Sequence, residues 1–272
     1  MGVMVCIPKS NRLQVTTGAF ILLAIALLSL IGPYVTPDPF SQNLSSVFAT
    51  PSSTYLLGSD HLGRSVAARL IHGGANSLCN ASLCVAGMVF LGVFLGLCSG
   101  WYGGLIDAAI MRLVDITMSF PGILLALLIA GLIGGGQMAV VGALIVTGWP
   151  DYCRITRAIT QSIISRPYVE AGVLAGFSGP FILRKYIIIE IVPQIAVLAT
   201  LGFGRTILNI SSLGFIGIGL DPPEPEWGAM IAESLPYIRQ APHLILAPAA
   251  AVSITVFSFM LVGQPLAQSV KK

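Results

Sequence analysis

The sequence predicts an all-α, polytopic membrane protein with about six transmembrane helices. Only 9% of its 272 residues are charged and 55% are hydrophobic, with a mean hydropathy of +0.88. A soluble domain usually carries about 25% charged residues. The charges present here cannot cover a water-facing surface of this size, so most of the surface is expected to face lipid. The second observation is a series of long apolar runs, each near the roughly 20 residues that a helix needs to cross a bilayer.

Six runs justify the predicted helices in order. The first run, residues 14–35, is too long for the apolar part of a signal peptide and has no small-residue cleavage site, so we expect an uncleaved transmembrane helix. Glycines 134–136 mark a tight turn between the third and fourth runs. Gly202, Gly204 and Arg205 interrupt the long fifth run, which is therefore expected to be broken or tilted. The runs are residues 14–35, 78–100, 117–136, 137–156, 187–219 and 243–264.

Positive charge sets the predicted orientation, because cytoplasmic loops of membrane proteins carry an excess of Lys and Arg. With both termini inside, the cytoplasmic set is far larger than the outer set, so we expect both termini to be cytoplasmic. The cytoplasmic set is Lys9, Arg12, Arg112, Arg154, Arg157, Arg166, Arg184, Lys185, Lys271 and Lys272, and the outer set is Arg64, Arg69 and Arg239.

The resulting organisation has a single membrane-embedded core. The predicted segments are a cytoplasmic N-terminus 1–13, a first transmembrane helix 14–35, a periplasmic segment 36–76, a five-helix core 77–264 and a cytoplasmic C-terminus 265–272. The core contains a cytoplasmic loop at 157–186 and a periplasmic loop at 221–242.

The outer segments carry most of the acids and all three histidines. The interpretation adopted is that exposed loops carry polar residues, and the alternative is an outer mouth that attracts a cation. These residues are Asp38, Asp60, Asp221, Glu224, Glu226, Glu233, His61, His72 and His243.

The five cysteines form no CxxC pair and are predicted to be small core residues, so no metal site is expected. A net charge of +3 without a basic stripe does not indicate nucleic-acid binding.

The cytoplasmic segment 165–180 has the signals of a short helix. Pro167 suits the first turn of a helix, and Glu170 near that N-terminus is favoured by the helix dipole. Gly176 is expected to end the helix after about three turns. Such a helix could dock in a groove of a cytosolic partner, although an ordinary connecting loop fits the same residues.

Glu170-Ala171-Gly172, with Gly176 and then Pro193, resembles the EAA loop of bacterial binding-protein-dependent ABC importers. In that family the loop is the coupling helix, which sits on the nucleotide-binding subunit. Gly172 stands where the family pattern has its second alanine. The resemblance implies that the ATPase-coupling helix here includes Tyr168, Val169, Glu170, Ala171, Gly172 and Gly176.

Three further segments are similar to the peptide/nickel permeases of that family, so that four matches with the EAA loop stand in the right order along the chain. They are 57–64, 100–104, and 213–220 followed by 226–228. The resemblance implies the ABC importer type I permease fold, in the second or C-type permease subunit of a bacterial inner-membrane system. The longer stretch after Gly176 and residues 198–201 resemble the nickel branch. The implied function is half of a translocation pathway for nickel or a metal-chelate complex, with di- or oligopeptide import as the alternative.

The chain is not expected to be an enzyme or to bind a cofactor. It contains no GxxxxGK[ST] nucleotide-binding run, so the resemblance implies that ATP and Mg bind to partner ATPase subunits. The implied partners are a homologous second permease in a heterodimer, two cytosolic ABC ATPase subunits or domains, a periplasmic or lipid-anchored solute-binding protein and the lipid bilayer, with no nucleic acid.

Charges within the spans are expected to have specific roles. Arg205 lies in an apolar run, where a charge is costly and marks a functional site by default. It is expected to line a water-filled pathway or to pair with an acid from another helix. Local pairs are predicted for Arg112 with Asp115 and for Asp151 with Arg154.

Two other classes of protein remain as alternatives. A secondary transporter driven by an ion gradient often has acids at the membrane midplane, whereas only Glu190 lies near a span, close to its cytoplasmic end. A membrane-anchored scaffold does not account for the ordered loop motifs.

Gly87, Gly92 and Gly96 in the second run are expected to allow close helix packing.

Overall fold

The computed structural model describes residues 9–219 and 223–270. Within these ranges the elements are helices and turns, and the β-structure is one isolated bridge between Ser59 and Ser65. The all-α fold is therefore confirmed. Three residues used in the sequence analysis, Asp221, Lys271 and Lys272, lie outside the described ranges.

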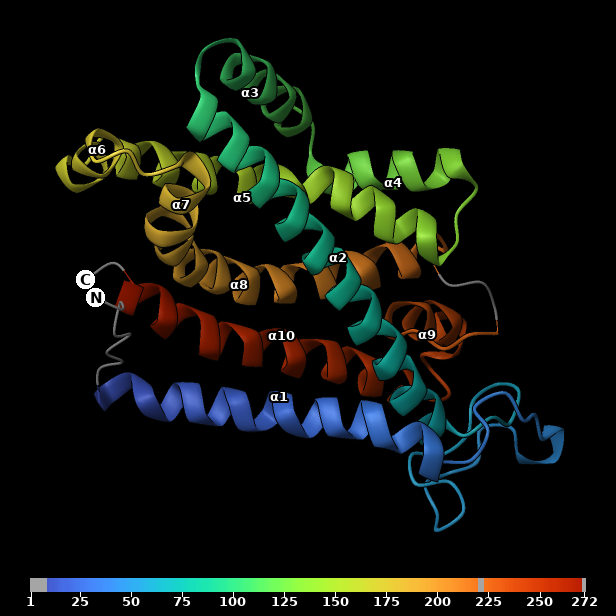
Figure 1. The fold of residues 1–272 in the computed structure, drawn as a ribbon. Coiled ribbons are helices and arrows are strands. Elements are labelled where there is room, and N and C mark those ends of the chain that lie inside the picture. Colours follow the sequence, from blue (N-terminus) through green and yellow to red (C-terminus); the bar gives the residue numbers. More distant parts are fainter. Residues whose placement is uncertain (1–8, 220–222, 271–272) are drawn as a thin grey trace.

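The long helices run side by side, and α2 crosses them diagonally (Figure 1). The helices are α1 (Lys9–Val35), α2 (Val66–Tyr102), α3 (Gly104–Met118), α4 (Gly122–Ile133), α5 (Gln137–Ile164), α6 (Pro167–Leu174), α7 (Gly179–Ile182), α8 (Ile188–Phe215), α9 (Trp227–Ser234) and α10 (His243–Val270). A π-helical turn (Leu183–Ile187) joins α7 to α8, and 3₁₀ turns lie at Leu44–Ser46 and Leu235–Tyr237.

Four stretches in the described part of the chain are long and apolar enough to cross a membrane: Asn11–Val35, Val66–Tyr102, Gly179–Phe215 and His243–Ser269. Helices α3 and α4 add a fifth candidate if their 90° bend is the break of one span. Helix α5 has 28 residues but carries Asp151, Arg154 and Arg157, and it does not meet the same criterion. The six predicted runs thus correspond to six helical units, of which up to five qualify by length and composition.

Three helix ends differ from the bounds of the predicted runs. The run 117–136 straddles the bend between α3 and α4, because Pro121 disfavours helical backbone in the residue before it. Helix α2 begins at Val66 and not near residue 78, since Ser65 caps it by accepting a hydrogen bond from the Ala68 amide. Helix α5 continues to Ile164, past residue 157, where the loop was predicted to begin.

The packing of α2 against α5 depends on glycine, as predicted. A Cβ added at Gly96 would lie 2.6 Å from the carbonyl oxygen of Cys153, and one at Gly92 would lie 2.6 Å from that of Trp149. At Gly87 the same atom would meet the side chain of Ile145 at 2.4 Å. The two backbones therefore approach to distances that no larger residue permits.

The molecule has two distinct ends. Helix α6, the start of α1 and the end of α10 lie at one end, and α9 lies with the segment between α1 and α2 at the other (Figure 1). The long helices, α5 and α8 among them, connect these ends (Figure 1).

Candidate coupling helix and polar cavity

Helix α6 forms where the sequence predicts a short helix. Arg166 is extended (φ −84°, ψ 140°) and Pro167 occupies the first turn, where its missing N–H costs nothing. Val169 and Gly172 are buried against the rest of the protein, while Glu170 is exposed. The buried pair fixes which face of the helix packs against the protein, and Glu170 stays accessible to solvent.

The end of α6 is a Schellman motif. Gly176 has a φ of +81°, and its amide donates to the carbonyl of Val173 at 3.0 Å. The amide of Phe177 donates to the carbonyl of Gly172, also at 3.0 Å. Gly176 therefore terminates the helix as predicted, although α6 has eight residues rather than about three turns.

The surface beside α6 is apolar and hollowed. Leu174 is 89% exposed and Val173 57%, and the rings of Phe177 and Phe181 are also exposed. The ring of Tyr168 packs against Tyr186 at a centroid distance of 5.6 Å. A groove of about 740 Å³ runs along the helix and is lined by Trp101, Ile164, Ser165, Val169, Glu170, Val173, Leu174 and Ile182. Five of the six residues expected in the coupling helix lie in α6, and the sixth, Gly176, terminates it.

A second hollow of about 710 Å³ lies between α5 and α8 and reaches the bend between α3 and α4. Most of its lining is apolar, but three charged side chains face it: Asp151 and Arg154 of α5 and Arg205 of α8. Arg205 Nη1 lies 3.2 Å from Asp151 Oδ2, and the Arg205 side chain is 75% exposed. Of the two expectations for Arg205, pairing with an acid from another helix is confirmed, and the side chain also lines this polar cavity.

Both predicted local pairs are wrong. Asp115 pairs with Arg154 at 2.7 Å and not with Arg112, and Asp151 pairs with Arg205 and not with Arg154. Spacing along a single helix cannot show that a neighbouring helix presents a better-placed partner. In both cases the observed pair joins two different helices.

A further pair fastens α3 to α5. Arg157 Nη2 lies 2.6 Å from Asp107 Oδ2, and Arg157 Nε contacts the other carboxylate oxygen at 2.5 Å. Ser99 of α2 also donates to Asp107. Spacing along one helix does not predict this pair, because Arg157 and Asp107 are 50 residues apart in the sequence.

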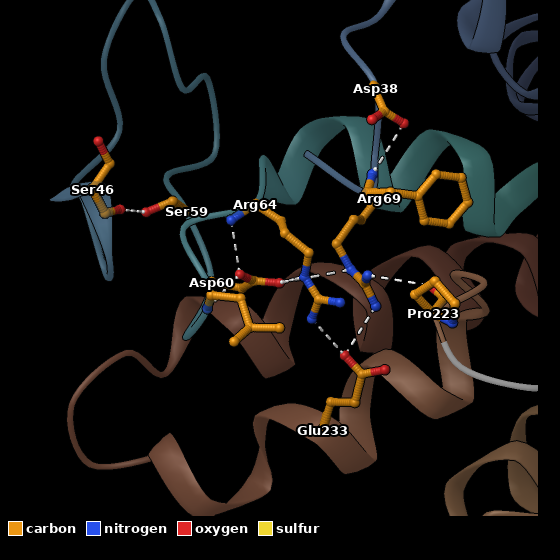
Figure 2. Close-up of polar contacts among 10 residues, drawn as sticks. Asp38, Ser46, Ser59, Asp60, Arg64, Arg69, Pro223 and Glu233 are labelled. Carbon is orange, nitrogen blue, oxygen red and sulfur yellow. Dashed lines mark hydrogen bonds and ion pairs between the residues drawn. The ribbon is translucent and has the colours of Figure 1, made fainter. Parts of the chain in front are cut away.

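At the opposite end, a buried charge cluster joins the segment before α2 to α9 (Figure 2). Arg64 contacts Asp60 at 2.6 Å and Glu233 at 2.9 Å, and Arg69 contacts Glu233 at 2.9 Å. The Arg64 and Arg69 side chains are 4% and 2% exposed. The interpretation of Asp60 as an exposed loop residue is therefore wrong, because two arginines compensate its charge and that of Glu233.

Glu226 is a second buried acid near α9. It caps that helix by accepting a hydrogen bond from the Ala229 amide at 2.9 Å, and it accepts another from the Ser77 hydroxyl at 3.1 Å. Burial raises the pKa of the Glu226 carboxyl, while these hydrogen bonds and those from Gly228 and Ser211 oppose the rise. The carboxyl thus joins α9 to both α2 and α8.

Metal ligands do not gather in the part of the chain that the structure describes. No group of three or more His, Cys, Asp or Glu side chains there is placed to hold a metal ion. Of the three histidines, His61 stacks on Tyr237 at a centroid distance of 5.0 Å.

Comparison with known proteins identifies the fold and the family. Residues 89–272 match the family described as binding-protein-dependent transport system inner membrane component. The chain belongs to this family. It is therefore a multi-pass membrane component of an inner-membrane transport system, and the resemblance to ABC importer permeases is confirmed.

Named relatives cover nearly the whole chain. The dipeptide transport system permease protein DppC of Haemophilus influenzae is 33% identical over 265 residues, 95% of this chain and 90% of the relative. The nickel transport system permease protein NikC of Escherichia coli K12 is 33% identical over 258 residues, 94% of this chain and 93% of the relative. The chain is equally similar to both, so these comparisons do not separate the nickel branch from the peptide branch.

A solved structure gives the same fold. An inward-facing form of the MetNI methionine ABC transporter aligns with a TM-score of 0.58 at 18% identity, covering 75% of this chain and 97% of that chain.

Proposed function

We propose that this chain is the transmembrane permease subunit of an ATP-driven ABC importer and forms half of its translocation pathway. Membership in the binding-protein-dependent family is the observation that carries the proposal. The polar cavity between α5 and α8 is this chain's part of the pathway, and Arg205 is one of its lining residues. A homologous second permease supplies the other half.

We further propose that α6 is the coupling helix. It is connected through Ser165 to α5 and through α7 to α8, and these two helices supply most of the residues that line the cavity. A displacement of α6 by cytosolic ATPase subunits therefore acts directly on both walls. ATP and Mg bind to those partners, and the cavity alternates between two packing arrangements that solute and nucleotide favour differently.

The partners and orientation follow from the same proposal. A solute-binding protein delivers solute to the end formed by α9 and the segment before α2, and the ATPases bind at the α6 end. This places both termini in the cytoplasm, in agreement with the excess of Lys and Arg near the α6 end. The solute is nickel or a metal-chelate complex, or a di- or oligopeptide.

The test is uptake by the reconstituted assembly in proteoliposomes, with its binding protein and ATPases present. We expect uptake of labelled nickel or of a labelled dipeptide to require ATP and to persist when ion gradients are collapsed. A secondary transporter would show the reverse dependence. Uptake that is independent of ATP and depends on an ion gradient would contradict the proposal.

A further inference from the structure

Arg205 is the least constrained arginine among the ion pairs of the described chain. Its single contact with Asp151 is 3.2 Å long, and its side chain is 75% exposed. Arg157, in contrast, contacts both carboxylate oxygens of Asp107 and is 29% exposed. A guanidinium has several N–H donors in a fixed fork, and most of the fork of Arg205 is directed to no partner in the described residues.

The surroundings of Arg205 suit a solute rather than a structural pair. The cavity of about 710 Å³ lies within the range of about 300–1,000 Å³ typical of small-molecule sites. Asn209 lies one helical turn further along α8 and also lines the cavity, so it presents an amide beside the guanidinium. A Cβ at Gly202 would lie 2.4 Å from the Tyr152 hydroxyl, so this glycine makes room for the Tyr152 side chain, which also lines the cavity.

The chemistry of the fork indicates which solute group it binds. Guanidinium and carboxylate match in a two-bond geometry, which is stronger and more specific than a single contact. A carboxylate that entered the cavity could therefore replace Asp151, which makes one contact with Arg205 and is itself 44% exposed.

We propose that Arg205 is a specificity-determining residue that binds a carboxylate of the transported solute in exchange for Asp151. The proposal rests on the proposed function, because it assigns the cavity to the translocation pathway. The solute class is an organic acid or zwitterion, and two sources share this chemistry: a short peptide, or nickel held by a carboxylate chelator. Bare hydrated nickel is disfavoured because two of the three charged cavity residues are arginines.

The experiment measures equilibrium binding to the purified permease–ATPase assembly without the binding protein, so that the selectivity of that protein does not enter. Two probe pairs are used: dialanine with its C-terminal amide, and nickel citrate with nickel chloride. We expect the wild type to prefer the carboxylate member of one pair, and that pair identifies the source. Arg205→Gln should remove the preference, weakening binding of the carboxylate probe about ten- to a hundredfold, as expected for a lost charge-assisted hydrogen bond.

Two variants separate solute binding from structural support. Asp151→Asn should tighten binding of the carboxylate probe, because it releases Arg205, whereas a purely structural pair would give weaker binding in both variants. Arg239→Gln removes an exposed arginine near α9 and should change nothing. The inference is overturned if the wild type shows no carboxylate preference in either pair, or if Arg205→Gln retains the preference. ATP-dependent uptake by the wild type is scored separately, so failure of the proposed function is distinguishable.

Discussion

Removing Arg69 from the buried cluster near α9 should destabilise the protein substantially. In Arg69→Gln, Arg64 alone would face two carboxylates, Asp60 and Glu233, that are 8% and 29% exposed. Breaking a buried ion pair by deleting one partner costs about 3–5 kcal/mol. Water reaches Glu233 and Arg64 remains, so the lower end of that range, about 3 kcal/mol, is expected.

The assay is thermal unfolding of the purified protein in detergent. For a chain of this size, each kcal/mol corresponds to about 2–4 °C, so Arg69→Gln should lower Tm by about 6–12 °C. Arg239→Gln is the matched control, because this exposed arginine of the same region should change the free energy of unfolding by about 0.5 kcal/mol at most.

A double variant isolates the pair itself. Arg69→Gln with Glu233→Gln should be less destabilised than the sum of the two single changes, because it leaves no unpaired charge between them. A Tm for Arg69→Gln equal to that of Arg239→Gln would refute the reasoning, and so would strict additivity in the double variant.

Three further predictions concern Glu226, helix packing and the end of α6. Because its folded pKa is raised above the ordinary value of 4.5, the stability contribution of neutral Glu226 is present below that pH and is lost as pH rises through the folded pKa. Glu226→Gln should therefore gain in Tm relative to the wild type on going from pH 4 to neutral pH, and a constant difference would contradict this. Gly96→Ala should cost about 1–3 kcal/mol in unfolding assays, since its Cβ would lie 2.6 Å from the Cys153 carbonyl oxygen. Its control, Gly142→Ala, has nothing within 4 Å in α5 and should be neutral or stabilising, so equal losses would show that packing is not the cause. Gly176→Ala should reduce ATP-dependent uptake more than Gly176→Asn, because asparagine tolerates the left-handed backbone at φ +81° better than alanine, and equal uptake by both variants would contradict the role of this cap.

Local signals in the sequence predicted α6 well. Pro167 and Gly176 act on their own neighbours, through a fixed φ at one end and a left-handed backbone at the other, so a single sequence is enough to place them. The glycines of α2 were likewise readable, since a missing side chain permits close approach whichever helix is the neighbour.

The ion pairs could not be predicted in the same way. Asp151 and Arg205 are 54 residues apart, and Arg154 and Asp115 are 39 apart, so only the packing of α5 against α8 and α3 brings them together. Helical spacing favoured nearer partners for Asp151 and Asp115. A local rule has no information about the neighbouring helix, and here that helix determined the pairs.

The polar start of α2 was missed for a related reason. Hydropathy predicts a helix only where the residues are apolar enough to face lipid. The first turns of α2 contain Arg69, whose charge is compensated by Glu233 of α9, so they do not meet that condition. Hydropathy therefore placed the start of the helix about three turns too late. The cap at Ser65 was the available local signal, because its side chain accepts a hydrogen bond from the Ala68 amide.

The central claim, that α6 couples ATP hydrolysis to transport, is tested most directly at Glu170. Its side chain is exposed, and a lysine near a helix N-terminus costs only about 0.3–1 kcal/mol, so Glu170→Lys should still fold and insert. The measurement is ATP-dependent uptake of labelled nickel and of a labelled dipeptide by membranes containing equal amounts of wild type, Glu170→Lys or the control Ser162→Lys. We predict that Glu170→Lys loses uptake of the solute that the wild type imports and co-purifies less ATPase, whereas Ser162→Lys keeps both. Wild-type uptake and wild-type ATPase recovery in Glu170→Lys would contradict the account.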